Sequence, residues 1–350
     1  MSTKSCVIGL VYLIAFAAIR PSFDAPALGS EDCASRRIGI ARFEFESKHM
    51  GTTFRIVLYA ANREVAEKAS KAAFARVAEL DGIMSDYKKD SELMRLGAKS
   101  GEAVPVSEDL FLVLSKAEYM SKVSDGAFDI TVGPVVQLWR HARRTQQLPD
   151  KDELAAALAK VDYRKVQLDR NNQTVKLFAP GMQLDLGGIA KGYAADAALQ
   201  LLREKFGIKQ ALVAASGDIT CGDPPPDKDA WSVDIAPIAK GQKPRGLKLA
   251  NAAVSTSGDL EQFVEIGGVR YSHIVDPKTG LGITGRRSVT VIAKRGVTAD
   301  SMTKAVMLMP REKALELVEN TNGTAVYIVT VGKDEKLEFV ESKRFNEFAK

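Results

Sequence analysis

Alternating apolar and polar positions predict β-strands along most of the chain from Arg42 onward. The alternation covers residues 43–45 and 54–59, on either side of the segment Met50-Gly51-Thr52-Thr53. Two hairpins are predicted where such runs flank the turn-forming pairs Asn171-Asn172 and Gly267-Gly268. The predicted strands, hairpin arms included, cover residues 165–169, 174–178, 182–186, 211–215, 231–235, 247–255, 263–266, 269–274, 288–293, 325–331 and 337–340.

Helical periodicity separates these strands. Asn62 is suited to capping a long helix that extends to about residue 85, and Ser107 to capping a helix over residues 108–123. Because strands cluster in hairpins and helices stand between them, we expect an α+β fold with mainly antiparallel sheets. The remaining predicted helices cover residues 151–159, 189–206, 299–309 and 312–319.

Residues 1–20 have the pattern of a secretory signal peptide. Lys4 precedes the apolar stretch 6–19, which Arg20 ends. The stretch is shorter than the roughly 20 residues that a membrane-spanning helix needs. Cys6 lies inside it, which argues against a lipoprotein cleavage site. We expect cleavage between residues 20 and 30 and export to the periplasm or the outer face of the cytoplasmic membrane, with an uncleaved N-terminal anchor as the alternative.

Composition narrows the chemistry. The 350 residues include three Cys, with no C-x-x-C pair, and three scattered His, which are His49, His141 and His273. These numbers exclude a disulfide framework and a metal centre built on Cys or His, so any metal must have oxygen ligands. The formal net charge is +5 and no long basic run is present, so we expect no nucleic-acid partner.

One segment, residues 184–193 (L-D-L-G-G-I-A-K-G-Y), predicts a phosphate site between a strand and a helix. Glycines at such a turn let backbone N–H groups approach a phosphate, and the helix N-terminus favours its charge. Lys191 would add a cation in the first turn. The segment matches no general nucleotide fingerprint, and Gly187-Gly188 as a plain tight turn is the alternative.

Three other segments carry candidate chemistry, each with a structural alternative. Asp125 and Asp129 lie in residues 124–134, which end in Gly133-Pro134; carboxylates in such segments commonly cap turns. His273, three residues before Asp276, is a candidate general base or a structural residue.

Asp300 and Thr303 form the last of these segments and lie on one face of a predicted helix start, where both offer oxygen. They are candidate Mg²⁺ ligands, because Mg²⁺ prefers carboxylate, hydroxyl and carbonyl oxygens. Ordinary helix capping is the alternative. Separately, Tyr87 follows the first long helix and would either stack on an aromatic ring or cover the core.

Taken in order, seven segments resemble the FAD:protein FMN transferase family, also called ApbE-type flavin transferases. They extend over about residues 40–310, nearly the whole mature chain. The segments are Met50-Gly51-Thr52, Met84-Ser85-Asp86-Tyr87 with Ser91-Glu92, residues 126–134 (G-A-F-D-I-T-V-G-P), residues 185–193 (D-L-G-G-I-A-K-G-Y), residues 255–258 (S-T-S-G), residues 273–280 (H-I-V-D-P-K-T-G) and Ala299-Asp300.

The resemblance implies a T-fold-like architecture and an FMN transferase domain over residues 40–345, as one unit or two subdomains. It also implies Mg²⁺-dependent transfer of FMN from FAD to a Thr or Ser hydroxyl of an acceptor protein, with release of AMP. The implied acceptor is a redox protein that is exported or membrane-associated, which agrees with the leader. Membrane association would come through the leader or the acceptor. A Mg²⁺-dependent FAD hydrolase and a non-enzymatic FAD carrier are the alternatives.

The resemblance also implies residue roles. Gly188 would offer a carbonyl to the metal, Asp300 a carboxylate and Thr303 a hydroxyl, and His273 would deprotonate the acceptor hydroxyl. The residues implied to contact FAD are Met50, Tyr87, Ala127, Phe128, Asp129, Asp185 and Lys191.

The chain departs from the family pattern at two places. The pattern has a Thr four residues after the Asp of the last motif, whereas this chain has Lys304 there and Thr303 one residue earlier. A protonated Lys cannot bind Mg²⁺, so either Thr303 supplies the oxygen or Lys304 brings a cation close to the phosphates. Residues 214–218 (A-A-S-G-D) stand where many members have Asn-x-Gly-Gly.

Overall fold

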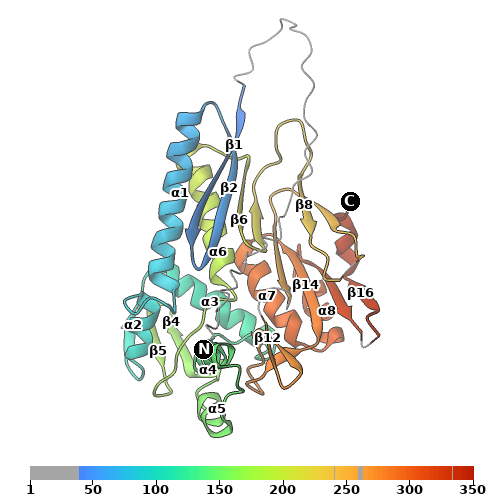
Figure 1. Cartoon of the computed structure of the whole chain (residues 1–350). Coiled ribbons are helices and arrows are strands. Elements are labelled where there is room, and N and C mark those ends of the chain that lie inside the picture. Colours follow the sequence, from blue (N-terminus) through green and yellow to red (C-terminus); the bar gives the residue numbers. More distant parts are fainter. Residues whose placement is uncertain (1–38, 240, 259–262, 333) are drawn as a thin grey trace, which may run out of the picture.

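An antiparallel sheet forms the centre of the protein (Figure 1). The computed structural model describes residues 39–350 except 240, 259–262 and 333, so the expected leader lies outside the described residues. In this part of the chain the strand order is β1-β2-β6-β7-β10-β14-β15-β16. The strands are β1 (Ala41–His49), β2 (Thr52–Ala60), β6 (Ala211–Ala215), β7 (Asp218–Cys221), β10 (Ala253–Gly258), β14 (Arg286–Ala293), β15 (Ala325–Val331) and β16 (Leu337–Glu341).

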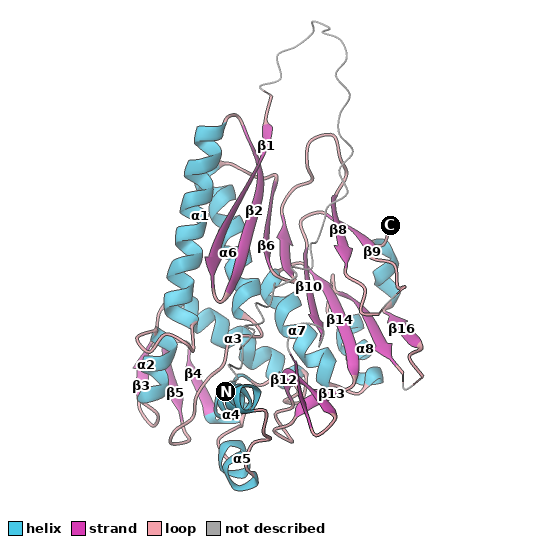
Figure 2. Ribbon diagram, in the orientation of Figure 1, coloured by secondary structure: helices cyan, strands magenta, loops and turns pink. Residues whose placement is uncertain are grey.

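The two faces of this sheet pack against different layers. Ile56 and Leu58 of β2 belong to the main core, whereas Val57 between them packs on the opposite face with Trp231 and Phe345. This separation follows from the two-residue period of a strand. Four of the helices that contribute to the main core cover its face of the sheet (Figure 2), namely α1 (Arg63–Met84), α6 (Ala190–Phe206), α7 (Gly296–Leu308) and α8 (Arg311–Asn320).

Smaller elements complete the described fold. The hairpin β8 (Trp231–Ile235) and β9 (Arg245–Leu249) covers the second face of the central sheet. Two three-stranded sheets are built from β3 (Ala103–Pro105), β5 (Thr174–Leu177) and β4 (Val166–Asp169), and from β11 (Phe263–Ile266), β12 (Val269–Val275) and β13 (Gly282–Thr284). The other helices are α2 (Glu92–Ala98), α3 (Glu108–Val123), α4 (Gly133–Thr145) and α5 (Lys151–Leu158).

Helices α6 and α7 cross in backbone contact at Gly192 and Gly296. A Cβ added at Gly192 would clash with the Gly296 carbonyl and lie 2.8 Å from Asp300 Cβ. The crossing is held by Asp196 of α6, whose Oδ1 accepts the Gly296 N–H at 2.7 Å and whose Oδ2 accepts the Val297 N–H at 3.2 Å. Asp196 therefore caps the start of α7 from the neighbouring helix.

Most predicted elements are confirmed, and the capping residues explain why their limits were predictable. The Asn62 side chain accepts the Val65 N–H at 2.9 Å, and the Ser107 hydroxyl accepts the Leu110 N–H at 3.3 Å, so α1 and α3 begin as expected. Met50 and Gly51 form the two-residue turn of the β1–β2 hairpin, with φ angles of 49° and 71° that suit a type I′ turn. The α+β prediction with mainly antiparallel sheets is confirmed.

Two predicted strands were wrong. Residues 182–186 bury alternate side chains as a strand does, but they form no strand; the Asp185 N–H donates to the Ile130 carbonyl at 2.7 Å beside a short 3₁₀ turn. Residues 247–255 are two strands, β9 and β10, because the chain turns at Asn251, whose φ is 48°. Asn tolerates this left-handed conformation better than most residues.

Helix α4 is not predicted by the sequence, in which Gly133-Pro134 marks the end of a segment. Pro134 instead lies in the first turn of this helix, where its missing N–H costs nothing. Helix α2 and strands β3, β7 and β13 were also not predicted. None of the helices in the described ranges is both long and apolar enough to cross a membrane.

Replacing Gly192 with Ala tests the helix crossing. The added methyl group meets the backbone of α7, so we expect the free energy of unfolding to fall by about 1–3 kcal/mol, as for overpacked cores. Urea denaturation measures this change. Gly82→Ala in α1 is the matched control, because a Cβ there meets nothing within 4 Å, and we expect it to stabilise the protein by roughly 0.4–1 kcal/mol. Equal midpoints for the two variants would contradict the crossing.

Candidate active site

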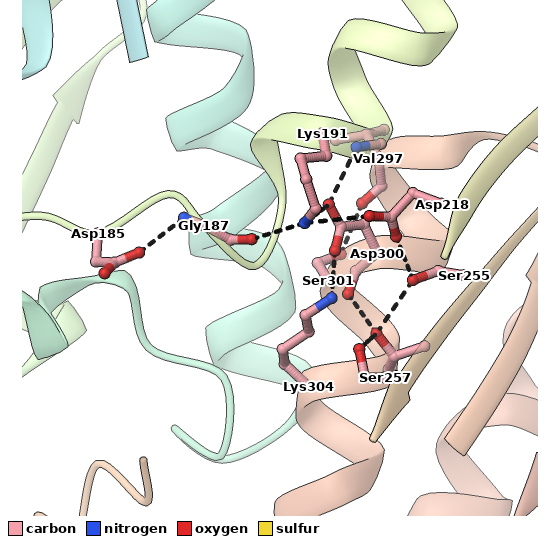
Figure 3. Close-up of polar contacts among 12 residues, drawn as sticks. Asp185, Gly187, Lys191, Asp218, Ser255, Ser257, Val297, Asp300, Ser301 and Lys304 are labelled. Carbon is pink, nitrogen blue, oxygen red and sulfur yellow. Dashed lines mark hydrogen bonds and ion pairs between the residues drawn. The ribbon is translucent and has the colours of Figure 1, made fainter. Parts of the chain in front are cut away.

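Asp300 lies at the centre of a buried polar cluster beside the crossing of α6 and α7 (Figure 3). Its side chain has no exposed surface. Asp300 Oδ2 accepts the Gly192 N–H at 3.0 Å and lies 3.8 Å from Lys191 Nζ, and Oδ1 forms an ion pair with Lys304 Nζ. The spacing of Asp300 and Lys304 along α7 places both on one face of the helix. The carboxylate is thus enclosed by one backbone donor and two ammonium groups.

Lys191 connects this carboxylate to the central sheet. Its Nζ donates to the Gly187 carbonyl at 3.1 Å and lies 3.1 Å from Asp218 Oδ2, at the start of β7. Asp218 Oδ1 in turn accepts the Ser255 hydroxyl of β10 at 2.5 Å. Lys191 of α6 therefore contacts α7 through Asp300 and β7 through Asp218, and Asp218 extends the connection to β10.

The charges of the cluster compensate one another. Burial alone would raise the pKa of Asp300, but the charges of Lys191 and Lys304, with hydrogen bonds from Lys304 and the Gly192 N–H, hold it below its usual range. Burial likewise opposes charge on Lys191, and Asp218 and Asp300 outweigh it and raise the pKa of Lys191. The Asp300 carboxylate and the Lys191 ammonium thus both favour their ionised forms in a largely buried site.

The turn before α6 lies against this cluster. Asp185 Oδ1 accepts the Gly187 N–H at 2.7 Å, which holds the turn in shape. A Cβ at Gly188 would lie 3.2 Å from Lys304 Cγ and 3.4 Å from Phe128 Cε2, so this glycine sits between the two side chains. Helix α6 has no side-chain N-cap and no acidic residue in its first turn. An anion placed here would meet the positive end of the helix and Lys191.

Arg140 of α4 organises a second group of charges next to the turn. Its Nη1 lies 2.6 Å from Asp86 Oδ2, and its Nη2 lies 3.3 Å from Asp185 Oδ2. The guanidinium also stacks on the Tyr87 ring, 4.1 Å from the ring centroid. Tyr87 is 75% exposed, so its ring is available to a ligand. Burial and the Asp86 charge raise the pKa of Asp185, against the Gly187 N–H and Arg140.

Asp129, an expected FAD contact, has a structural role. Its Oδ1 accepts the Thr131 N–H and hydroxyl at 2.8 and 2.7 Å, and its Oδ2 accepts the Tyr163 N–H at 2.9 Å. Burial raises the pKa of Asp129 despite these bonds. The neighbouring residues Ala127 and Phe128 are buried, and Phe128 reaches Gly188 as described above. The turn-capping alternative thus describes the Asp129 carboxylate.

Met50 and His273, the expected FAD contact and the expected base, lie on elements that contribute no side chain to the Asp300 cluster in the described part of the chain. Met50 is in the turn of the β1–β2 hairpin and packs against the main core. His273 is half-buried on β12, in the small sheet that follows β10 in the chain. Asp276, considered as its partner, uses Oδ1 to accept the Lys278 N–H at 2.8 Å and so shapes the following turn.

The side-chain oxygens of the expected Mg²⁺ ligands Asp300 and Thr303 are engaged with other groups of the protein. An ammonium group lies against Asp300 Oδ1, and Oδ2 accepts the Gly192 N–H. The Thr303 hydroxyl donates to the Asp300 carbonyl at 2.7 Å and accepts from Ser257 at 3.1 Å. Mg²⁺ needs near-octahedral oxygen ligands, and the side-chain oxygens of Asp300 and Thr303 already have other partners. Asp300 and Thr303 therefore do not fit a resident Mg²⁺ ion in this arrangement.

Sequence reasoning did not assign roles to several residues of the site. Asp218, Ser255 and Ser257 were parts of motifs, and Asp86 and Arg140 were not singled out. An available signal was the i,i+4 spacing of Asp300 and Lys304 on a predicted helix, which predicts an ion pair.

A surface depression of about 560 Å³ lies elsewhere, lined among others by Arg245, Tyr327 and Phe339, and shares no residue with the cluster.

Comparisons with known proteins agree on one family. A sequence model of the ApbE family matches residues 50–328. The FAD:protein FMN transferase of Haemophilus influenzae is 33% identical over 295 residues, covering 81% of this chain and 84% of that protein. The protein of the same name from Treponema pallidum is 35% identical over 293 residues, 78% of this chain and 80% of its own length. The flavin transferase ApbE from Vibrio cholerae superposes with a TM-score of 0.80 at 29% identity, covering 89% of this chain and all (100%) of that chain.

Replacing Arg140 with Met tests the second charge group. The change leaves Asp86 and Asp185 side by side without a cation, so we expect a loss of about 1–3 kcal/mol of stability at neutral pH. Without Arg140 the pKa of Asp185, which burial already raises, rises further above its unfolded value, so the destabilisation is present at neutral pH. It fades as the pH falls through that raised pKa and Asp185 becomes protonated.

Urea denaturation of the wild type and Arg140→Met at pH 7 and pH 4 measures this difference. Arg144→Met, at an exposed position on the same helix, is the control and should change stability little at either pH. A loss for Arg140→Met that is equal at the two pH values would contradict the charge-based explanation.

Proposed function

The chain belongs to the ApbE family, and from this premise we propose that it is an FAD:protein FMN transferase. It transfers FMN from FAD to a protein acceptor and releases AMP. The fold and the ordered motifs support this function along most of the chain. The acceptor is a Thr or Ser hydroxyl of a redox protein.

The observation that carries this function is the pair of ammonium groups beside the Gly187–Gly188 turn. Lys191 and Lys304 bring two ammonium groups to the first turn of α6, where helix geometry already favours an anion. The pyrophosphate of FAD is the dianionic group that fits such a place. The exposed ring of Tyr87, backed by Arg140, offers a surface on which the aromatic flavin or adenine can stack.

The transfer exchanges one phosphorus–oxygen bond for another. The acceptor oxygen forms a bond to the phosphorus on the flavin side of the pyrophosphate, and the bond from that phosphorus to the bridging oxygen breaks. The bridging oxygen leaves with AMP and takes the electron pair. The hydroxyl proton passes to His273, because a hydroxyl is a poor nucleophile at neutral pH without a base.

Charge neutralisation is the contribution that Mg²⁺ makes in phosphoryl transfer when it is bound. Gly188, Asp300 and Thr303 are the residues expected to hold it. The side-chain oxygens of Asp300 and Thr303 already have partners within the protein. The cations available from the chain itself are Lys191 and Lys304.

The site of action follows from the apolar leader. Export through residues 1–20 would place the enzyme in the periplasm or at the outer face of the cytoplasmic membrane. The acceptor would then be an exported or membrane-associated redox protein. This part of the proposal is supported by the sequence pattern of the leader alone.

Incubating the purified protein with FAD and envelope proteins from cells lacking it tests the function. We expect fluorescent protein bands that carry covalent flavin, with an equal amount of AMP. Free FMN and AMP without labelled protein would identify an FAD hydrolase. Bound, intact FAD without AMP would identify a carrier, and either result would contradict the transferase.

Replacing His273 with Ala tests the base. We expect the transfer rate to fall about 10²–10⁴-fold, the usual contribution of a general base, with FAD affinity unchanged. Stopped assays of AMP release and quenching of flavin fluorescence measure the two quantities. His141→Ala, at an exposed position on α4, is the control and should transfer at the wild-type rate. Undiminished transfer by His273→Ala would remove this histidine from the mechanism.

Replacing Tyr87 with Ala tests the stacking surface. We expect FAD affinity to weaken by about 0.5–1.5 kcal/mol, the usual energy of an aromatic pair beyond its buried area. Tyr119→Ala is the matched control, because Tyr119 is also largely exposed but lies on α3. Fluorescence titration with FAD measures both variants, and equal affinities would show that Tyr87 does not contact the ligand.

A further inference from the structure

Lys304 occupies the place where an oxygen ligand is expected. The family pattern has a Thr four residues after the Asp, and Lys304 stands there in this chain. In the structure the Lys304 ammonium forms an ion pair with the fully buried Asp300 carboxylate. Its side chain is 16% exposed and therefore not fully enclosed. Its stem lies against Gly188, with the closest approach to an added Cβ at 3.2 Å.

A divalent ion and this ammonium compete for the same oxygen. Asp300 Oδ1 is paired with Lys304, and Oδ2 with the Gly192 N–H and, at longer range, Lys191. The neighbouring Thr303 hydroxyl donates to the Asp300 carbonyl and accepts from Ser257, so it does not replace the missing ligand. A metal bound to Asp300 would have to expel a cation that is tethered four residues away on the same helix.

We propose that Lys304 takes the place of a divalent metal ion in this enzyme. Held by Asp300 Oδ1, its ammonium binds the FAD pyrophosphate together with Lys191, and FMN transfer proceeds without a resident metal. The two ammonium groups together carry the charge of one Mg²⁺ ion, and each is held in place by a carboxylate, Lys304 by Asp300 and Lys191 by Asp218. This inference rests on the proposed FMN transferase function.

The chemistry of transfer needs this charge on the leaving side. When the phosphorus–oxygen bond to the bridging oxygen breaks, the electron pair stays on the phosphate of AMP. A positioned cation stabilises that charge as it develops, which is the largest single contribution in many enzymes. AMP leaves as an anion, so Lys304 keeps its proton, and the acceptor proton goes to His273. Atoms and charges balance without a further reactant.

Metal binding without substrate tests the proposal independently of activity. Mn²⁺, observed by electron paramagnetic resonance, is the probe. We expect the wild type to bind no Mn²⁺ at Asp300, and Lys304→Thr to bind one ion, because this change removes the ammonium and adds a hydroxyl. Lys313→Thr, at an exposed position on α8, is the control and should behave as the wild type. A wild-type Mn²⁺ site that Asp300→Asn abolishes would overturn the proposal.

AMP release from FAD in the presence of EDTA is the second measurement. We expect the wild type to be unaffected by EDTA and Lys304→Thr to become dependent on added Mg²⁺. Lys304→Met removes the charge without adding a ligand, and should slow AMP release about 10²–10³-fold with or without Mg²⁺, as for loss of one electrostatic group. Lys304→Arg keeps the charge and should retain transfer in EDTA. Wild-type activity that EDTA removes and Mg²⁺ restores would overturn the proposal.

The two measurements separate the possible failures. If the wild type releases no AMP from FAD under any condition, the proposed function fails, while the Mn²⁺ experiment still decides whether Lys304 excludes a metal. Urea denaturation of each variant establishes that it is folded. Lys304→Met then distinguishes a functional cation from a structural one. A structural role predicts that this variant loses the same free energy of unfolding with and without FAD bound.

Discussion

The backbone contact between α6 and α7 at Gly192 is the constraint on which the site depends. Because neither helix carries a Cβ at the crossing point, the Gly192 N–H reaches Asp300 Oδ2 at 3.0 Å across the interface. Asp196 fixes the other end of the contact by capping α7. Together these bonds hold Asp300 in the interior, where a carboxylate needs charged or hydrogen-bonding partners to remain ionised.

The partners that Asp300 requires are also the groups that suit an anionic ligand. Lys191 and Lys304 satisfy the buried carboxylate, and both side chains are partly exposed and lie against the Gly187–Gly188 turn. Asp218 and Ser255 anchor Lys191 from the sheet side. The stability of the cluster and the proposed binding of pyrophosphate therefore depend on the same charges, and pairing offsets the cost of burying them.

The sequence predicted the elements whose limits are set locally and missed features that depend on tertiary contacts. Caps such as Asn62 and Ser107 act within one turn, so α1 and α3 began where expected. The turn before Lys191 was predicted because its glycines mark it. By contrast, Arg140 contacts Asp86 and Asp185 only in the folded protein. These residues lie far apart in the chain, so no periodic pattern in the sequence predicts their ion pairs. The capping role of Asp129 was anticipated only as an alternative.

A crystal structure of the protein with FAD tests the central claim most directly, because it locates the pyrophosphate relative to the two lysines. We expect phosphate oxygens in contact with Lys191 and Lys304, beside the Gly187–Gly188 turn, with the ion pair between Lys304 and Asp300 retained. Two results would contradict it. One is FAD bound elsewhere, such as in the depression at Arg245. The other is a metal ion on Asp300 with Lys304 displaced.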